Sequence, residues 1–336
     1  MNLTLPRRRF LQTVFCSSAA LALNLRPRTL LAAPEPGDLH LLMIGDFGSG
    51  GPAQSAVAGG MKTYLERQRI KPEWLLLLGD NFYKNSKLGG GLSPERWKSG
   101  FEEMYPASVF DCPCPTVLGN HDYHDTVDGQ KMQLAYAAAG GTRWTLPAKW
   151  YRKELRDVAT FLFLDTNLRS VSGKADPEDK SVDKKLKPSL TAEEEVAQWT
   201  WLREQLASKR APFTIVVGHH PVYSNGVHGD SRELVEKLAP MLQAAGVQLY
   251  LCGHDHDLQH LELAGQKTSF VLSGGGGARA RELKNTTRQM PFGTAVNGFS
   301  HLQINAQRAV VRHLDANGKQ YHALEKSVDH AWKVLG

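Results

Sequence analysis

The sequence predicts an α/β fold whose second half is rich in β-strands. Apolar runs alternate with helical patterns in the first part of the chain, and several runs end abruptly at a Gly followed by a polar residue. From His260 onward the pattern changes to short alternating strands, which predict a second β layer. The 336 residues, of which 41% are hydrophobic and 22% charged, are sufficient to bury a large core.

Six apolar runs before His260 predict buried strands, because each run is continuous and stops at a turn-forming residue. These strands are Leu39–Ile44, Trp74–Leu78, Thr116–Leu118, Thr160–Leu164, Phe213–Val217 and Val247–Leu251. The predicted helices between them are Pro52–Gln68, Thr191–Ser208 and Ser231–Ala244. Glu194, three residues after Thr191, completes a capping box at the start of the second of these helices.

The later strands are shorter and alternate apolar with polar residues. They are predicted at Glu262–Leu263, Thr268–Leu272, Ser300–Ile304, Ala309–Leu314 and Tyr321–Leu324. We therefore expect one domain over residues 39–326, with a linker at 34–38 before it and a C-terminal tail at 327–336 after it.

The first 33 residues resemble a twin-arginine export signal. Pro6 is followed by Arg7, Arg8, Arg9 and Phe10, and a mildly apolar stretch then leads to small residues at the end of the segment. An uncleaved membrane anchor is the alternative, but polar residues interrupt this stretch and a spanning helix needs about 20 apolar residues. The segment predicts export through the twin-arginine translocase to the periplasm or beyond, with no stable membrane anchor.

The net charge of +6 first suggests a nucleic-acid partner. Five arginines and no acidic residue lie within residues 1–33, so +6 less 5 leaves +1 for the rest of the chain. This distribution excludes the charge argument for nucleic-acid binding. Cys112, Cys114 and Cys252 are too few and too badly spaced for a disulfide framework or a zinc site, and we expect them to be structural.

Residues 173–188 are charged, interrupted by proline and without apolar rhythm. This composition predicts an exposed loop. We hypothesise that the loop gates access to a site, and a solvated insertion is the alternative.

Several predicted strands end at metal-binding residue types. The carboxyl ends of buried strands converge on one rim of an α/β fold, so these side chains are expected to lie close together. They are Asp46, Asp80, Asn120, His121, His219, His254 and His256. Each of them alone has an ordinary explanation as a turn former or a satisfied histidine, but their joint occurrence indicates a site for two metal ions that share one carboxylate.

The motifs GDNFY at Gly79–Tyr83, GNHD at Gly119–Asp122 and GHDH at Gly253–His256 resemble those of the calcineurin-like metallophosphoesterases. Two positions narrow the resemblance to the small purple acid phosphatases of the tartrate-resistant type. Asp46 is not followed by the histidine of the wider superfamily, and Tyr83 occupies the position of the tyrosinate that binds ferric iron. A core tyrosine packed against an aromatic neighbour is the alternative for Tyr83.

This resemblance implies a four-layer αββα sandwich with two mixed β-sheets between helices and the metal site at the strand ends. It also implies two sets of ligands that share Asp80. The set for Fe(III) is Asp46, Asp80, Tyr83 and His256. The set for a second ion, Fe(II), Zn(II) or Mn(II), is Asp80, Asn120, His219 and His254. His121 and His228 are implied as catalytic residues, and together with Asn120 they are implied to bind the substrate phosphate.

The resemblance predicts an exported acid phosphatase, expected as a monomer, that hydrolyses small-molecule or protein phosphate monoesters with a metal-activated hydroxide. Two alternatives stay open: a phosphodiesterase or nucleotidase of the same superfamily, and a non-catalytic secreted metal-binding protein. The chain departs from the mammalian enzymes at His220, which stands where they have tyrosine.

Overall fold

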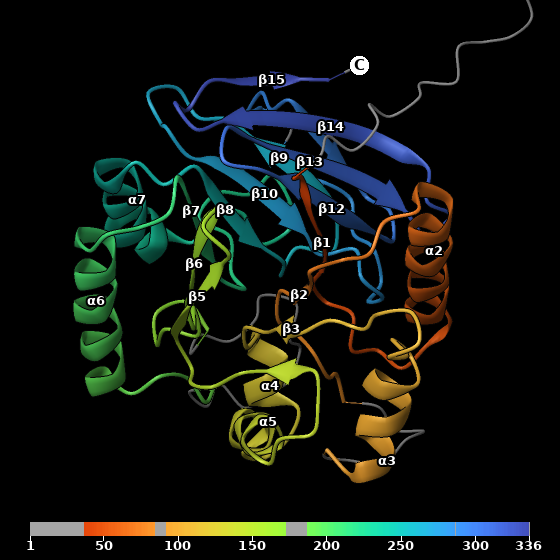
Figure 1. The fold of residues 1–336 in the computed structure, drawn as a ribbon. Helices are drawn as coiled ribbons and strands as arrows, with labels where there is room; N and C mark the ends of the chain where they lie inside the picture. Colours follow the sequence, from red (N-terminus) through yellow and green to blue (C-terminus); the bar gives the residue numbers. More distant parts are fainter. Residues whose placement is uncertain (1–36, 85–91, 173–186, 286, 336) are drawn as a thin grey trace, which may run out of the picture. The chain divides into compact units, whose positions relative to one another are not determined.

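The computed structural model describes residues 37–84, 92–172, 187–285 and 287–335. Residues from Leu39 onward form one compact unit, and residues 1–33, for which an export signal is predicted, lie outside the described residues. Two mixed β-sheets face each other, with helices on their outer faces (Figure 1). The predicted four-layer αββα arrangement is confirmed.

One sheet contains six strands within the described residues, in the order β15-β14-β13-β12-β1-β2. Strand β1, next to the edge strand β2, pairs antiparallel with β12 and parallel with β2. The strand bounds are β1 Leu39–Ile44, β2 Trp74–Leu77, β12 Gly298–Ile304, β13 Arg308–Asp315, β14 Gln320–Ser327 and β15 Trp332–Val334.

The other sheet contains seven strands within the same ranges, in the order β11-β9-β10-β8-β7-β6-β5. Strands β6, β7, β8 and β10 run parallel in its middle. The bounds are β5 Tyr151–Leu155, β6 Ala159–Phe163, β7 Phe213–Val217, β8 Leu249–Cys252, β9 Leu258–Leu261, β10 Ser269–Ser273 and β11 Phe292–Thr294. A small parallel pair is formed by β3 Cys114–Pro115 and β4 Trp144–Thr145.

The helices cover the outer faces of the sheets and one end of the sandwich. In Figure 1, α2 lies against the six-stranded sheet, α6 and α7 lie beside the seven-stranded sheet, and α3 to α5 lie beneath the strand ends. The helix bounds are α2 Pro52–Gln68, α3 Pro94–Trp97, α4 Asn120–His124, α5 Gly129–Ala138, α6 Ala192–Ala207 and α7 Ala239–Ala245, with π-helical turns η1 Lys98–Glu102 and η2 Leu234–Leu238.

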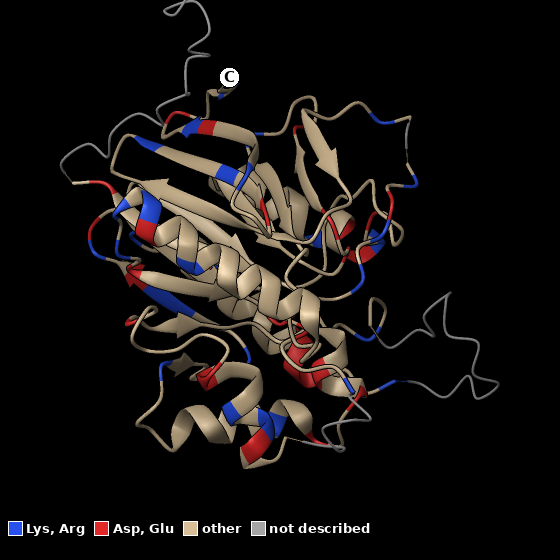
Figure 2. Cartoon of the chain, turned by 90° about the vertical axis from the view of Figure 1, so that its right-hand side faces the viewer, with Lys and Arg blue, Asp and Glu red and all other residues tan. Residues whose placement is uncertain are grey.

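Apolar side chains fill the space between the layers. Leu41 of one sheet and Val271 of the other belong to one buried cluster, and Leu202 of α6 and Leu242 of α7 belong to a second cluster with the outer face of the seven-stranded sheet. Charged residues are spread over the helices, the loops and several strands (Figure 2). Burial of apolar surface, worth about 25 cal/mol per Å², therefore holds the strand ends in fixed positions.

The capping box at Thr191 is confirmed. The Thr191 hydroxyl accepts a hydrogen bond from the Glu194 backbone N–H at 3.2 Å, and the Glu194 carboxylate accepts one from the Thr191 N–H at 3.0 Å. These bonds satisfy two of the otherwise unpaired N–H groups at the start of α6.

Two predicted strands are wrong. Thr116–Leu118 makes only an isolated bridge at Thr116, and the strand at this place, β3, lies earlier, at Cys114–Pro115. The Tyr151 hydroxyl additionally bonds both the N–H and the carbonyl of Thr116 at 2.9 Å. Glu262–Leu263 lies beyond β9, which ends at Leu261. Strand β9 contains buried polar side chains, so a search for apolar runs did not predict it.

Two further expectations need correction. The predicted helix Ser231–Ala244 is divided into η2 and α7, because Pro240 has no backbone N–H and interrupts the α-helical ladder. Residues 327–336, expected as a tail, contain β15, which pairs antiparallel with β14. The predicted loop 173–188 lies outside the described residues over 173–186.

A cluster of buried histidines bridges the two sheets near β9, β13 and β14. His260 Nδ1 lies 3.0 Å from His322 Nε2, and His313 Nε2 lies 3.1 Å from the carbonyl of Gln259. The His322 ring stacks on Phe292 with centroids 4.7 Å apart. Burial, and then the proximity of His260, lowers the pKa of His322 to about 4.

We expect this cluster to make the fold sensitive to acid. The pKa of histidine is about 6.5 in an unfolded chain and is lower for His322 in the fold. The neutral, buried His322 therefore contributes its full share to the folding stability above pH about 6.5, and this share is lost as the pH falls towards 4. His322→Gln keeps a hydrogen-bonding group beside His260 but does not titrate. The melting temperature should therefore fall less between pH 7 and pH 5 in this variant than in the parent, and equal falls would contradict this assignment.

Candidate metal centre

The candidate ligands lie on loops that follow four strands and at the start of α4. Asp46 follows β1, Asp80 follows β2, His219 follows β7, and His254 and His256 follow β8. The first residue of α4 is Asn120. Strands β1 and β2 are parallel neighbours in one sheet, and β7 and β8 are parallel neighbours in the other. The carboxyl ends of all four strands therefore place the polar side chains on one rim.

Four side chains form a first cluster. The Tyr83 hydroxyl lies 3.2 Å from Asp46 Oδ1, 3.1 Å from Asp80 Oδ2 and 3.3 Å from His256 Nε2. His256 Nε2 lies 3.5 Å from Asp46 Oδ1. The structure thus brings together the ligand set that the resemblance implies for Fe(III).

A second cluster adjoins the first. Asn120 Oδ1 lies 3.1 Å from His219 Nε2 and 3.0 Å from His254 Nδ1. His219 Nε2 also lies 3.3 Å from Asp80 Oδ1. The two oxygens of Asp80 therefore face different clusters, which would allow this carboxylate to bridge two cations.

The backbone is strained at three of these positions. Asp46 has a φ of 58°, Asp80 has a φ of 51° and His254 has a φ of 73°, all in the left-handed region that non-glycine residues rarely adopt. Each such residue costs of order 1–3 kcal/mol and persists only when the surrounding structure enforces it. Strain of this kind is concentrated at functional sites.

The glycines beside the ligands allow close packing of the loops. A Cβ atom at Gly79 would collide with the His219 ring, and one at Gly119 would collide with the Asp80 carboxylate. The repeated pattern of Gly followed by a polar residue therefore has a steric cause at these two positions.

Backbone carbonyls orient two of the histidines. His219 Nδ1 lies 2.9 Å from the carbonyl of Leu78, and His256 Nδ1 lies 2.9 Å from the carbonyl of Arg279. A carbonyl only accepts hydrogen bonds, so Nδ1 carries the proton and Nε2 keeps its lone pair in both rings. Both Nε2 atoms point into the clusters, as metal-binding histidines require.

Asp122 joins the two central loops, and sequence reasoning assigned it no role. Its carboxylate accepts hydrogen bonds from the backbone N–H groups of Asn81 at 3.0 Å, Phe82 at 3.2 Å and Gly119 at 2.8 Å. The Gln133 side-chain amide donates a further bond at 2.8 Å. Asp122 thereby fixes the GDNFY loop relative to the GNHD loop, and its place within GNHD was the available signal.

The predicted catalytic histidine His121 lies beside the first cluster. Its ring centroid is 4.5 Å from that of Tyr83, and its Nδ1 lies 2.9 Å from Asp125 Oδ2. Asp125 was not predicted, although its position four residues after His121 in a helical segment is the spacing at which such pairs meet. Burial opposes the charged form, but Asp80 and then Asp125 outweigh it and raise the pKa of His121 to about 9.

The second predicted catalytic histidine, His228, lies beside the second cluster. Its ring centroid is 4.1 Å from that of His254, and its Nδ1 lies 2.8 Å from Oδ1 of the fully buried Asp255. The Arg281 guanidinium donates to His228 Nε2 at 3.2 Å. Asp255 and Arg281 were not predicted, because they lie 27 and 53 residues from their partner His228 in the sequence.

The donor groups of the two clusters are of kinds whose charged forms a bound cation would stabilise. Burial, and then the charges of Asp80 and Asp46, raises the pKa of Tyr83 well above 10. Burial also raises the pKa of Asp46, with the Asp80 charge adding and His219 opposing. A cation between these groups reverses the effect, because it favours the anionic form of each donor. The donor set of carboxylates, a phenol, an amide oxygen and neutral imidazoles is therefore suited to two metal ions.

Such a centre, at the strand ends of this four-layer fold, defines the class of metal-dependent phosphoester hydrolases. The chain belongs to the calcineurin-like phosphoesterases, whose family model matches residues 36–258.

Individual relatives agree with this class. The chain is 30% identical to tartrate-resistant acid phosphatase type 5 of Mus musculus, over 85% of this chain and 89% of that protein. It is 30% identical to purple acid phosphatase 4 of Arabidopsis thaliana, over 91% of each chain. The solved structure of GAP50, the anchor in the inner membrane complex of Plasmodium, has the same fold with a TM-score of 0.69 and 24% identity, over 85% of this chain and 88% of that one.

Proposed function

We propose that the protein is an exported acid phosphatase that hydrolyses phosphate monoesters at a dinuclear metal centre. The observation that supports this most strongly is Asp80, whose two carboxylate oxygens face two separate ligand clusters. The two acid phosphatase relatives support the choice of substrate class within the family.

The first cluster is proposed to hold Fe(III), because a phenolate and carboxylates are hard anionic donors. The second cluster, with two imidazoles and one amide oxygen, is proposed to hold Fe(II), Zn(II) or Mn(II). When bound, two such ions supply positive charge for the phosphoryl oxygens and acidify water.

The remaining residues of the site bind phosphate and handle protons. Asn120 and His121 lie at the start of α4, and this helix terminus favours a negatively charged ligand. The 2.9 Å contact between Asp125 and His121 Nδ1 orients the ring, and we propose that Nε2 of His121 donates to a phosphoryl oxygen or a departing alkoxide. Asp255 and Arg281 hold the His228 ring in place beside the opposite cluster, where we propose that it helps to position the phosphate. General acid catalysis of this kind contributes about 10²–10⁴ in rate.

Export is proposed from residues 1–33, which lie outside the described residues. Within the part of the chain that the structure describes, no helix is both long enough and apolar enough to cross a membrane. We propose that the twin-arginine translocase carries the folded protein to the periplasm or beyond, and that substrates are met there.

The function is tested by comparing turnover of p-nitrophenyl phosphate with that of bis-p-nitrophenyl phosphate by metal-loaded protein from pH 4 to pH 8. We expect kcat/KM for the monoester to exceed that for the diester and to be largest below pH 7. A preference for the diester would instead assign a phosphodiesterase. Stoichiometric metal binding without turnover of either compound would assign a non-catalytic metal-binding protein.

Tyr83→Phe tests the ferric assignment. An iron-loaded protein should have a visible tyrosinate-to-iron absorption band that gives a purple colour, and this band should be absent from the variant. Tyr223→Phe is a suitable control, because Tyr223 packs on Phe270 outside both clusters. A band that persists in Tyr83→Phe, or a colourless iron-loaded parent, would contradict the assignment.

A further inference from the structure

A cavity of about 620 Å³ opens beside the second cluster. Asn120, His254 and His228 line its inner end, and Val171 and Val227 contribute apolar surface. A cavity within the 300–1,000 Å³ range is large enough for an organic small molecule. The space therefore exceeds what a phosphate group alone needs, and it lies where the rest of a phosphoester would extend.

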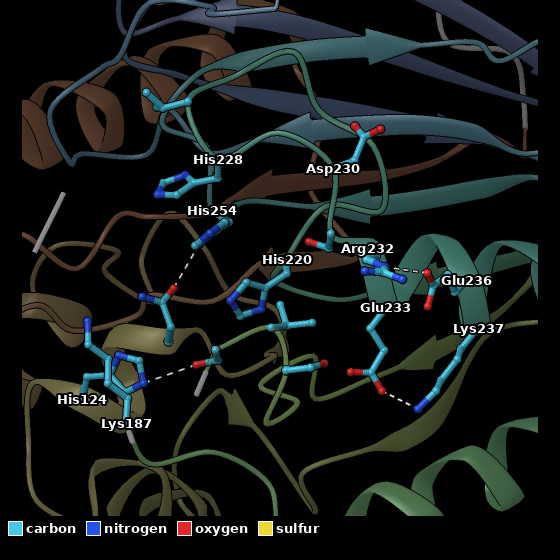
Figure 3. Close-up of a pocket in the computed structure, with 16 residues that line it drawn as sticks. His124, Lys187, His220, His228, Asp230, Arg232, Glu233, Glu236, Lys237 and His254 are labelled. Atoms are coloured by element: carbon cyan, nitrogen blue, oxygen red, sulfur yellow. Dashed lines mark hydrogen bonds and ion pairs between the residues drawn. The ribbon is translucent and has the colours of Figure 1, made fainter. Parts of the chain in front are cut away.

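His220 also lines this cavity, where its position would suit either a metal ligand or a hydrogen-bond donor to a bound molecule. Its ring centroid lies 4.4 Å from that of His254 and 5.0 Å from that of His219. One ring nitrogen each of His219, His220 and His254 lies within 4.8 Å of the others, so His220 has the location of a further metal ligand. Figure 3 shows its ring near His254 among the side chains that face the cavity.

The hydrogen bonds of Thr166 decide between a ligand and a donor. Thr166 Oγ1 accepts from the backbone N–H of His219 at 3.1 Å and from that of His220 at 2.9 Å. A hydroxyl has two acceptor lone pairs and one proton, so the remaining contact, 3.0 Å to His220 Nδ1, is a donation by Thr166. His220 Nδ1 is therefore the unprotonated nitrogen, and Nε2 of the neutral ring carries the hydrogen.

This tautomer gives His220 a donor that faces the cavity. A protonated Nε2 has no lone pair for a metal ion, and Nδ1 is already bonded to Thr166. The side chain is only 2% exposed, so packing holds the ring in place. Among the residues that the structure describes, no group accepts a hydrogen bond from Nε2–H, which is thus a preorganised donor for a bound molecule.

The formal charges of the cavity lining cancel, although the lining Asp230 pairs with Arg288, which lies outside the lining. Among the described lining residues, three are Lys or Arg and three are Asp or Glu. The acids are all ion-paired, at 2.5 to 2.7 Å, in Arg232–Glu236, Lys237–Glu233 and Arg288–Asp230. A wall of this kind offers no excess charge to an additional anionic or cationic group on the substrate.

We propose that this cavity is the leaving-group subsite and that His220 Nε2–H donates a hydrogen bond to a hydroxyl oxygen of the leaving group. The preferred substrates are then monoesters of small polyhydroxyl alcohols without additional net charge. This inference rests on the proposed phosphomonoesterase function and specifies its substrate class.

The test uses three substrates with the same number of carbon atoms: glycerol 3-phosphate, propyl phosphate and 3-phosphoglycerate. The parent should have its highest kcat/KM on glycerol 3-phosphate. In His220→Phe, kcat/KM for glycerol 3-phosphate should fall about threefold to tenfold, the size of one hydrogen bond, while that for propyl phosphate changes less than twofold. His220→Gln, which restores an N–H donor, should recover most of the loss and serves as the second variant if Phe disturbs folding.

Metal content is measured on every variant. Loss of a metal ion from His220→Phe would overturn the proposal, because His220 would then be a ligand. Equal losses on glycerol 3-phosphate and propyl phosphate, or a parent preference for 3-phosphoglycerate, would overturn it while leaving the proposed function intact. Failure of the parent to hydrolyse any of the three, or p-nitrophenyl phosphate, would overturn both.

Discussion

Replacing Asp80 with Ala is expected to lower kcat by about 10³-fold or more and to weaken metal binding at both clusters. Asp80 is 1% exposed, and its two oxygens contact different clusters. Each 1.36 kcal/mol lost from transition-state stabilisation is tenfold in rate, and the charge of a bound metal ion is worth several kcal/mol. Removing the carboxylate that both clusters share should therefore cost more activity than removing any single neutral ligand.

The measurement is kcat on a phosphate monoester together with the metal content per chain. Asp111→Ala is the matched control, because Asp111 is exposed, forms an ion pair with Lys71 and belongs to neither cluster. This control should keep the parent activity. An Asp80→Ala protein that retains two metal ions and more than about a tenth of the parent kcat would contradict the bridging role.

Replacing Asp122 with Ala is expected to destabilise the fold by about 3–5 kcal/mol. Asp122 is 2% exposed and accepts hydrogen bonds from Asn81, Phe82, Gly119 and Gln133. Each buried donor that loses its partner costs about 1–3 kcal/mol, and water entering the space offsets part of the sum. The two ligand loops should also lose their relative position, so that metal affinity falls although no ligand has been changed.

Urea unfolding of the metal-free protein measures the stability effect without the contribution of metal binding. The exposed Asp157 offers a control, since Asp157→Ala should stay within about 0.5 kcal/mol of the parent. A change of less than about 1 kcal/mol in Asp122→Ala would indicate that Asp122 does not hold the loops together.

The positions of the candidate ligands could be predicted because they follow buried strands. β1, β2 and β7 are recognisable as apolar runs, and the Gly before Asp80 marks the abrupt end of one of them. The physical constraint is local: a buried strand must end in a turn, and a glycine at that turn leaves room for a ligand side chain from another loop. Sequence carries both signals directly.

The supporting interactions could not be predicted in the same way, because they depend on tertiary contacts. The Tyr151 hydroxyl that bonds the backbone of Thr116 lies 35 residues away in the sequence. The tautomer of His220 follows from Thr166, which is 54 residues away. Buried polar residues in β9 are stabilised by partners on the opposite sheet, so no apolar pattern reveals that strand.

The central claim is that two metal ions lie on either side of Asp80. Anomalous diffraction from crystals of the metal-loaded protein tests it most directly, because it locates each ion independently of activity. Two peaks are predicted, one among Asp46, Asp80, Tyr83 and His256 and one among Asp80, Asn120, His219 and His254. A single peak, or a peak coordinated by His220 and not by Asp80, would contradict the account.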